Sequence, residues 1–518
     1  MLTLVELEQK YFPPELSPGV PNWDETLVIP HVDGEAFFAA IADALDQCEG
    51  TGDRIYIASW LFKPDMALRR AAGAPLLQSL LLDKAVHGAD VRVIVGTPRF
   101  SFGTSAASPL HVEFLLGWAA TLGPGAILAK LVSANIRAAR ALRTMQVSGS
   151  KPLNDRILMD WGGHGDSRHE KTTIVYIAKT NELRAFVGGM DYRVDRMADE
   201  VHSTWWWHDL GVELREGAAA AALANFVTRW EEAKTLPTQR YKIDNVIDVF
   251  NPDIAVTPPT LPTLPPRAMP ISVQPGQYLG ASVRMVRSYA TIRAYNPWLN
   301  TSNLPWKTLP ATGVQETFSV LKQAIAAANA YIYVEDQLLN PKTIESVYGA
   351  HSKIYPIISA ACARGVKVIF VTQGYAGPDF PPVSLTMSSE VRDRILGPLT
   401  AQQQANFVIY AVAGTKIHSK AMLIDDEFAL IGSANFWDRS MTGIESELGA
   451  AIVHPGGGSS LVADLRVRLW RGHLRVTASP DIDADLRDLG KSLGMFRSSW
   501  GAGVGFPHPN SALREIVP

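Results

Sequence analysis

The sequence "IHSKAMLIDDEFALIGSANF" spans residues 417–436 and is typical of a β-hairpin that carries polar residues near both ends. His418 and Lys420 are two positions apart, and on a strand residues i and i+2 point to the same face. Asp425 follows His418 by an odd offset, so a regular strand turns its side chain away from that face. We therefore expect His418 and Lys420 to act together, and Asp425 to be a buried, hydrogen-bonded structural residue.

The same pattern occurs earlier in the chain, in "HEKTTIVYIAKTNELRAFVGGMD" at residues 169–191. His169 and Lys171 repeat the spacing of His418 and Lys420, but Tyr176 stands at the position of Asp425. One such match is common by chance, whereas two matches at equivalent places indicate a functional duplication. Tyr176 either replaces the aspartate by packing its ring and bonding through its hydroxyl, or marks a degenerate first half. The retained histidine, lysine and glycine pair favour the first interpretation.

The segments before each hairpin repeat as well. Helical periodicity at residues 34–48 is matched at 314–330, and each is followed by an apolar strand, beginning near residues 54 and 331. A helix, a glycine and a β-branched strand then follow at 81–96 and again at 357–372. Gly88 and Gly365 stand just past these helices, where a left-handed C-cap favours glycine.

The duplication predicts an α/β fold of two similar halves, with mixed, mostly parallel sheets flanked by helices. Residues 252–275 contain eight prolines, which is typical of a semi-rigid connector. We predict a first lobe at residues 1–250, a linker at 251–275 and a second lobe at 276–518. The halves are either tethered independent domains or a pseudo-dimer that shares one site, and the paired motifs favour the pseudo-dimer.

The bulk composition excludes several classes of protein. The formal net charge of −3 does not suggest a nucleic-acid partner, and Cys48 and Cys362 are too few for a disulfide framework or a cysteine-rich zinc site. No basic n-region precedes an apolar run, and no apolar run is long enough to span a membrane. We expect a cytoplasmic protein, or one that is exported without a classical signal peptide.

The paired motifs suit phosphodiester chemistry. A lysine neutralises phosphate oxygens, and an imidazole attacks phosphorus or transfers a proton. Small residues at Gly188-Gly189 and Gly432-Ser433 allow a backbone or a phosphate to approach closely. Asn435 offers an uncharged donor, while Asp209 and Glu447 begin the next strands and are placed to orient histidines.

These residues resemble the phospholipase D superfamily, whose members carry two HxKxxxxD motifs in a bilobal α/β fold. The resemblance spans residues 30–475 and is to the phospholipase-like branch, through "IYIASWLFKPD", "GGMDYRVDR", "WHD", "IYVEDQ" and "ARGVKV". It implies one active site between the halves and a phosphohistidine intermediate. The implied catalytic residues are His169, His418, Lys171, Lys420, Asp209 and Glu447. The implied phosphate-binding residues are Lys171, Lys420, Asn435, Ser433 and Gly189.

The chain departs from this pattern at Asp191, which stands where the second half has Asn435. A further carboxylate would repel a phosphate unless it is protonated, paired with an arginine such as Arg193, or turned away. We therefore leave Asp191 out of the catalytic set. The chemistry needs no metal and no cofactor, and His164 and Asp166 are interpreted as loop residues and not as ligands. Isolated histidines such as His473 are interpreted as surface or packing residues.

The expected function is hydrolysis of the head-group phosphodiester of phospholipids, together with transfer to alcohols. Alternatives are a phosphatidyltransferase or phospholipid synthase, a nuclease of the same superfamily, and a non-catalytic binding protein. The expected partners are a phospholipid and, transiently, a membrane surface, and the protein is expected to be a monomer with an internal pseudo-twofold axis. Candidate membrane contacts are Trp205–Trp207, the loop with Trp298 and Trp306, and the basic, apolar insertion at 108–145.

Overall fold

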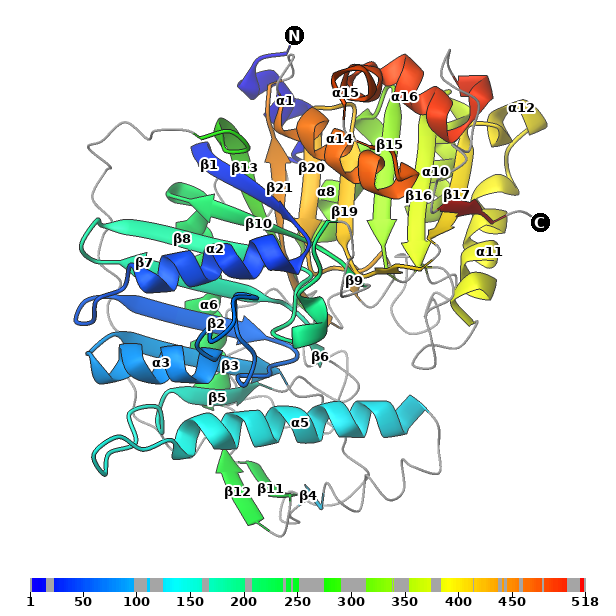
Figure 1. Cartoon of the computed structure of the whole chain (residues 1–518). Coiled ribbons are helices and arrows are strands. Elements are labelled where there is room, and N and C mark those ends of the chain that lie inside the picture. Colours follow the sequence, from blue (N-terminus) through cyan, green and yellow to red (C-terminus); the bar gives the residue numbers. More distant parts are fainter. Residues whose placement is uncertain are drawn as a thin grey trace.

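A computed structural model of the whole chain shows an α/β fold in which both halves contribute to one large sheet (Figure 1). The structure describes residues 2–14, 23–96, 110–111, 124–160, 167–200, 207–235, 239–243, 246–250, 274–289, 314–337, 339, 354–373, 383–412, 414–436, 440–441, 445–455, 460–477, 479–500 and 513–516. The predicted linker at 251–275 lies almost wholly outside these residues, as do His164 and Asp166.

The two halves of the sheet have the same strand order, counted from the outer edge to the junction. The first half runs β5 (Ile157–Asp160), β3 (Asp90–Gly96), β2 (Arg54–Ser59), β7 (Thr172–Ile177), β8 (Glu182–Gly188), β10 (Leu210–Arg215) and β1 (Trp23–Val32). The second half runs β17 (Phe407–Val412), β16 (Lys367–Gln373), β15 (Tyr331–Asp336), β19 (Lys420–Ile424), β20 (Phe428–Gly432), β21 (Glu445–Val453) and β13 (Tyr278–Tyr289). The short strands β14 (Val314–Gln315) and β22 (Leu513–Glu515) pair with β13 and β17.

The halves join where β1 pairs with β13 in antiparallel register, so equivalent strands meet at the junction. The expectation of mostly parallel sheets is met only at the outer strands, where β2, β3 and β5 and their counterparts β15, β16 and β17 are parallel. The inner pairs are antiparallel, because each histidine motif turns back as a hairpin and does not cross over through a helix.

Helices cover both halves of the sheet. The helices of the first half are α2 (Gly34–Asp46), α3 (Leu77–Val86), α5 (Pro124–Thr144) and α6 (Gly217–Thr235), with a 3₁₀ turn η1 (Val194–Arg196). Those of the second half are α8 (Glu316–Ala327), α10 (Ile354–Ala363), α11 (Val383–Leu396), α12 (Ala401–Gln404), α14 (Leu461–Leu474), α15 (Pro480–Arg487) and α16 (Leu489–Phe496), with a 3₁₀ turn η5 (Ser498–Trp500). A separate small sheet contains β4 (Leu110–His111), β11 (Gln239–Ile243) and β12 (Val246–Phe250).

One helix lies on a different half from the one that the sequence predicted, and part of another packs against the core. Helix α1 (Leu4–Tyr11), placed by the predicted boundary in the first lobe, packs on the second: Tyr11 stacks on Phe428 and its hydroxyl donates to Glu427 at 2.8 Å. In α5, the described apolar residues Ile136 and Leu142 are buried in the protein core. Among the described residues, no helix is long and apolar enough to cross a membrane.

The small residues of each motif allow close approach between strands. A Cβ added to Gly188 would lie 2.6 Å from the Cα of Gly211, and one added to Gly432 would lie 2.6 Å from the Cα of Gly449. Real Cβ atoms do not come so near another backbone atom, so both positions require glycine. The close approach of a second backbone, predicted for these pairs, is confirmed.

Asp425 is a hydrogen-bonded structural residue, as predicted, but it is only partly buried and stands in a turn and not on a regular strand. It lies in the turn after β19, and its carboxylate accepts the backbone N–H groups of residues 329, 330 and 331 at 2.7–2.9 Å. In the first half the equivalent link between the two turns is made by Asp53, which lies in the turn before β2. Its carboxylate accepts Gly50 N–H from its own turn and Ala178 N–H from the turn after β7, both at 2.8 Å. Tyr176 is then free of that task, and its hydroxyl donates to Asn181 at 2.8 Å.

These two aspartates lead to a matched stability prediction. Asp425→Ala and Asp53→Ala should each lower the free energy of unfolding by about 2 kcal/mol, because several backbone donors lose a charged acceptor. Tyr176→Phe, which removes one neutral hydrogen bond, should cost no more than about 1 kcal/mol. Urea unfolding followed by circular dichroism measures all three, and equal losses for Tyr176→Phe and Asp53→Ala would contradict the assignment.

Candidate active site

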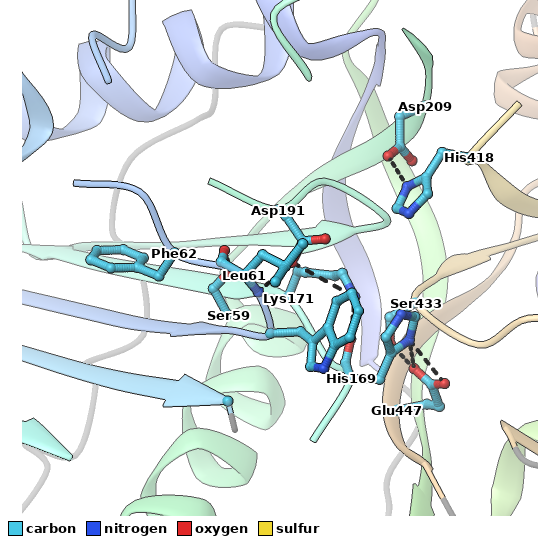
Figure 2. Close-up of polar contacts among 12 residues, drawn as sticks. Ser59, Leu61, Phe62, His169, Lys171, Asp191, Asp209, His418, Ser433 and Glu447 are labelled. Atoms are coloured by element: carbon cyan, nitrogen blue, oxygen red, sulfur yellow. Dashed lines mark hydrogen bonds and ion pairs between the residues drawn. The ribbon is translucent and has the colours of Figure 1, made fainter. Parts of the chain in front are cut away.

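Each motif histidine is hydrogen-bonded to a carboxylate from the other half (Figure 2). His418 Nδ1 lies 2.6 Å from Asp209 Oδ2, and His169 Nδ1 lies 3.1 Å from both carboxylate oxygens of Glu447. All four residues are buried. The sequence predicted that Asp209 and Glu447 orient the histidines, and the structure adds that each does so across the junction.

Two short parallel ladders between the halves hold these pairs. Strand β9 (Trp207–His208) pairs with β18 (Lys416–Ile417), and β6 (Ser167–Arg168) pairs with the start of β21. The ladders continue into the motifs: His418 N–H donates to His208 O at 2.7 Å, and His169 N–H donates to Ser446 O at 3.0 Å. His208 and Ser446 directly precede Asp209 and Glu447, so the backbone bonds place each imidazole beside its carboxylate.

The two motif lysines are buried next to their histidines. Lys171 Nζ donates to the carbonyl of His169 at 2.5 Å, and Lys420 Nζ donates to the carbonyl of His418. This equivalence follows from the shared i, i+2 spacing. Both ammonium groups lie close enough to the imidazoles to lower the pKa of His418.

The other predicted phosphate-binding residues have different surroundings. Asn435 is buried, and within the described part of the chain its side-chain Oδ1 has no hydrogen-bond partner. The Ser433 hydroxyl instead donates to Glu447 Oε2 at 2.6 Å. A Cβ on Gly189 would meet Asp209 Oδ1 at 2.1 Å, so glycine makes room there for the carboxylate. Ser433 and Gly189 therefore both border the orienting carboxylates.

Two residues that we did not select from the sequence complete this arrangement. Ser440 donates to Glu447 Oε1 at 2.6 Å, so two hydroxyls hold that carboxylate. Arg196 stands at the equivalent position of the first half, seven residues after Gly189, and its guanidinium lies 3.1 Å from the ring centre of Trp207. The positive charge of Arg196 stabilises ionised Asp209. The repeat itself carried the signal, since Ser440 likewise follows Ser433 by seven residues.

A tryptophan contacts each motif imidazole. Trp60 lies edge-on to His169 with ring centres 5.3 Å apart, and Trp207 lies edge-on to His418 at 5.2 Å. Trp207 is buried and is also contacted by Lys416, 3.7 Å from its ring centre. The expectation that Trp207 meets a membrane is therefore wrong, because the ring packs within the site. The other tryptophans proposed as membrane contacts lie outside the described residues.

Asp191 is also accounted for by its contacts. It is buried, its Oδ1 accepts Leu61 N–H at 2.8 Å, and the same oxygen lies 3.9 Å from Lys171 Nζ. The neighbouring Arg193 pairs with Asp195. Of the arrangements considered from the sequence, pairing with Arg193 is therefore not the one found, and Asp191 anchors the chain that leads to Trp60.

Among the described residues, two groups bring three potential metal ligands within 4.8 Å of one another. One is His169 with Glu445 and Glu447, and the other is His208 with Glu335 and His473. In both groups the histidines are hydrogen-bonded or ion-paired with the carboxylates.

Comparison with known proteins agrees with this geometry. Residues 321–469 match the family model described as "Cardiolipin synthase, PLD-like domain". Phospholipase D A of Dictyostelium discoideum is 23% identical over 88% of this chain, and Phospholipase D alpha 3 of Arabidopsis thaliana is 36% identical over 88 residues. The aligned parts make up 36% and 10% of those two proteins, so this chain matches only part of their length.

The fold comparison covers nearly the whole chain. The crystal structure of phosphatidylserine synthase from Haemophilus influenzae aligns over 96% of this chain and 98% of its own, with a TM-score of 0.51 and 13% sequence identity. At that identity the match concerns the fold alone. The family model and the phospholipase D relatives together support the phospholipase D superfamily for this chain.

Burial sets the protonation of this phospholipase D-type site. It lowers the pKa of His169 to about 3, with help from Lys171, and it lowers the pKa of His418 well below its usual value. Burial also raises the pKa of Asp209 to about 6 and that of Glu447 to about 7. Each histidine and its carboxylate titrate as one unit, and each unit loses its proton near neutral pH.

These raised carboxylate pKa values predict a bell-shaped dependence of kcat/KM on pH. Attack on phosphorus needs one neutral imidazole, and departure of the alcohol needs one protonated imidazole. Below about pH 6 both pairs hold a proton and the nucleophile is lost; above about pH 7 neither pair holds one and the acid is lost. Initial rates on a soluble phosphodiester between pH 4 and 9 test this, and an unchanged rate across that range would contradict it.

Gly189 supplies a second prediction about the site. Gly189→Ala should lower kcat by about 10²-fold, because the new methyl group displaces the Asp209 carboxylate that orients His418. Gly472→Ala is the matched control, since a Cβ there meets no atom within 4 Å. Steady-state kinetics of both variants, with unfolding curves to confirm folding, compare the two. Equal activity of both variants would show that the close contact is unimportant.

Proposed function

We propose that this protein is a phospholipase D-type phosphodiesterase that cleaves the bond between phosphate and head-group alcohol in phospholipids. The observation that carries the proposal is the pair of histidine–carboxylate hydrogen bonds closed across the two halves, with one lysine from each half beside them. Two similar imidazoles in one site can divide the roles of nucleophile and acid. Tyr176 does not argue for a degenerate first half, because Asp53 performs the structural task of the missing aspartate.

In the proposed reaction one neutral imidazole attacks phosphorus and forms a phosphorus–nitrogen bond. The bond from phosphorus to the head-group oxygen breaks, and the second, protonated imidazole gives its proton to that oxygen. This imidazole is then neutral and removes a proton from water as the water oxygen attacks phosphorus. The phosphorus–nitrogen bond breaks, phosphatidate leaves, and both imidazoles return to their starting states.

The surrounding groups suit this sequence of steps. Lys171 and Lys420 would stabilise the extra negative charge on the phosphate oxygens in the transition state, in a buried site where such interactions are strong. Asp209 and Glu447 would stabilise whichever imidazole is cationic. The Asn435 side chain would contribute a neutral hydrogen bond to the phosphate.

A phosphatidyltransferase would use the same intermediate, with an alcohol replacing water. Two findings keep this as the second candidate: the matched family model is described as of cardiolipin synthase type, and the structure that aligns over nearly the whole chain is a phosphatidylserine synthase. The sequence relatives named as phospholipases D favour hydrolysis. Which reaction dominates depends on access of water relative to alcohol.

We favour lipid over nucleic acid as substrate. The named relatives act in lipid chemistry, and the net charge of −3 gives no overall attraction for a polyanion. Binding to a phospholipid would require transient contact with a membrane surface. A non-catalytic binding protein would not need two complete histidine–carboxylate pairs.

Substitution of the histidines tests the shared site. His169→Ala and His418→Ala should each lower phosphatidylcholine hydrolysis by at least about 10³-fold, because each imidazole has its own step. His87→Ala is the control, since His87 is an exposed residue of the same type. Choline release from vesicles in the presence of EDTA measures activity. Retention of activity in either motif variant would refute a single shared site.

A primary alcohol separates the two candidate reactions. With 1-butanol present, the phosphohistidine intermediate should yield phosphatidylbutanol in competition with phosphatidate, which thin-layer chromatography resolves. Hydrolysis without any phosphatidylbutanol would argue against an intermediate open to alcohols. Plasmid cleavage with neither lipid product would instead identify a nuclease.

A further inference from the structure

Behind the Asp209–His418 pair lies a second layer of polar residues. Successive residues of a strand point to opposite faces, so His208 and Ser419, the chain neighbours of Asp209 and His418, point away from the catalytic side. Both are buried, and both contact Glu335 of strand β15. The residues next to Asp209 and His418 in the chain therefore meet on the far side of the pair, at Glu335.

These residues form a closed ring of polar contacts behind the Asp209–His418 pair. His208 Nδ1 lies 3.1 Å from Asp33 Oδ1, and its Nε2 lies 3.0 Å from Glu335 Oε2. Asp33 Oδ1 also accepts Asp209 N–H at 3.0 Å. Glu335 Oε2 also accepts the Ser419 hydroxyl at 2.6 Å. One imidazole therefore links the backbone that carries Asp209 to the backbone that carries His418.

We propose that His208, held between Asp33 and Glu335, is a positioning residue that fixes the Asp209–His418 pair for reaction across the two halves. It joins β9 of the first half to β15 of the second through its side chain, while its carbonyl accepts His418 N–H at 2.7 Å. The proposal rests on the proposed function only in assigning a role in turnover to the pair; the positioning itself is a property of the structure.

Charge strengthens this arrangement. Burial alone would lower the pKa of His208, but Asp33 and Glu335 together raise it well above its usual value. The imidazolium therefore meets a carboxylate at each nitrogen, and removing it would leave two buried carboxylates close together. Glu335 is also bonded to the Tyr333 hydroxyl at 2.6 Å and lies 2.8 Å from His473 Nε2. This carboxylate thus has a hydrogen-bonding partner for each of its lone pairs.

The half-site around His169 is built differently. Ser446 stands in the position of His208, and its short side chain does not reach across the halves as the imidazole does. Behind His169, Glu170 is instead paired with Arg229 and accepts bonds from Asn225 and Tyr289 at 3.2 Å. His208 held between Asp33 and Glu335, here called the histidine clamp, is therefore specific to the Asp209–His418 pair. Its loss should affect that pair and not the His169–Glu447 pair.

A cavity of about 650 Å³ gives access to the clamp. Its lining includes Asp33, His208 and His473, together with Arg468, Arg471 and Thr415. This volume lies within the range of about 300–1,000 Å³ typical of ligand pockets, so a small imidazole molecule can enter. The cavity makes chemical rescue of a truncated His208 a realistic experiment.

The test compares His208→Ala with wild type and with His473→Gln, which alters the same cavity and another hydrogen-bonding partner of Glu335. Nuclear magnetic resonance of ¹⁵N-histidine protein should show the hydrogen-bonded Nδ1 proton of His418 in wild type and in His473→Gln. His208→Ala should lose this signal and reduce kcat by about 10²-fold with little change in KM. Added imidazole should restore both, with saturation.

Three results would overturn the proposal: an intact His418 signal in folded His208→Ala, a loss of thermal stability with unchanged kcat, or recovery of stability without recovery of the signal. One equivalent of zinc in the purified protein, lost in His473→Gln, would also overturn it by making these imidazoles metal ligands. If wild type hydrolyses no phosphodiester, the proposed function fails, while the His418 signal in the variants still decides the positioning role.

Discussion

The structure depends on one constraint: each motif imidazole is hydrogen-bonded to a carboxylate from the opposite half of the chain. Neither half supplies both members of a motif pair, so the junction has to be accurate to within a hydrogen bond. The antiparallel pairing of β1 with β13 joins the two halves into one sheet. The two short parallel ladders then fix the position of one half relative to the other beside the site. The continuous sheet therefore holds the histidines of each half within hydrogen-bonding distance of the carboxylates of the other half.

The same constraint explains why so much charge is buried at the junction. Taking lysines, histidines and carboxylates out of water is unfavourable unless each has partners, and nearly every one described has them. Burial and the nearby lysines lower the pKa of both imidazoles and so favour their neutral forms. An anionic phosphodiester would favour protonation of one imidazole, so binding of substrate would also prepare the acid.

Strand periodicity in the sequence was sufficient to predict the duplicated fold, the histidine–lysine faces and the structural role of Asp425. It could not predict that the carboxylates cross between halves, because periodicity describes the face of one strand and not its partner in space. It also could not predict that acids change sides between the repeats. In the second half Asp425, after the motif strand, bonds to the turn before β15, whereas in the first half Asp53, before β2, bonds to the turn after the motif strand. In the same way, Asp191 follows β8 and accepts Leu61 N–H, whereas Asp336 ends β15 and accepts Phe436 N–H.

Helix α1 escaped the sequence analysis for a similar reason: its residues precede the first half but its apolar face fits the second. Position along the chain is a poor guide to packing where two halves share one sheet.

The meeting of equivalent strands at the junction has an evolutionary consequence. A single half could have formed the same sheet with a second copy of itself, since β1 and β13 occupy the same place in the two repeats. In such a homodimer every substitution would appear twice, and both half-sites would remain identical. A single chain that carries both halves lacks that symmetry, and here the first half has Gly189, Arg196 and His208 while the second has Ser433 and Ser440. The surroundings of the two histidines can therefore differ, because the two halves are inherited as one chain.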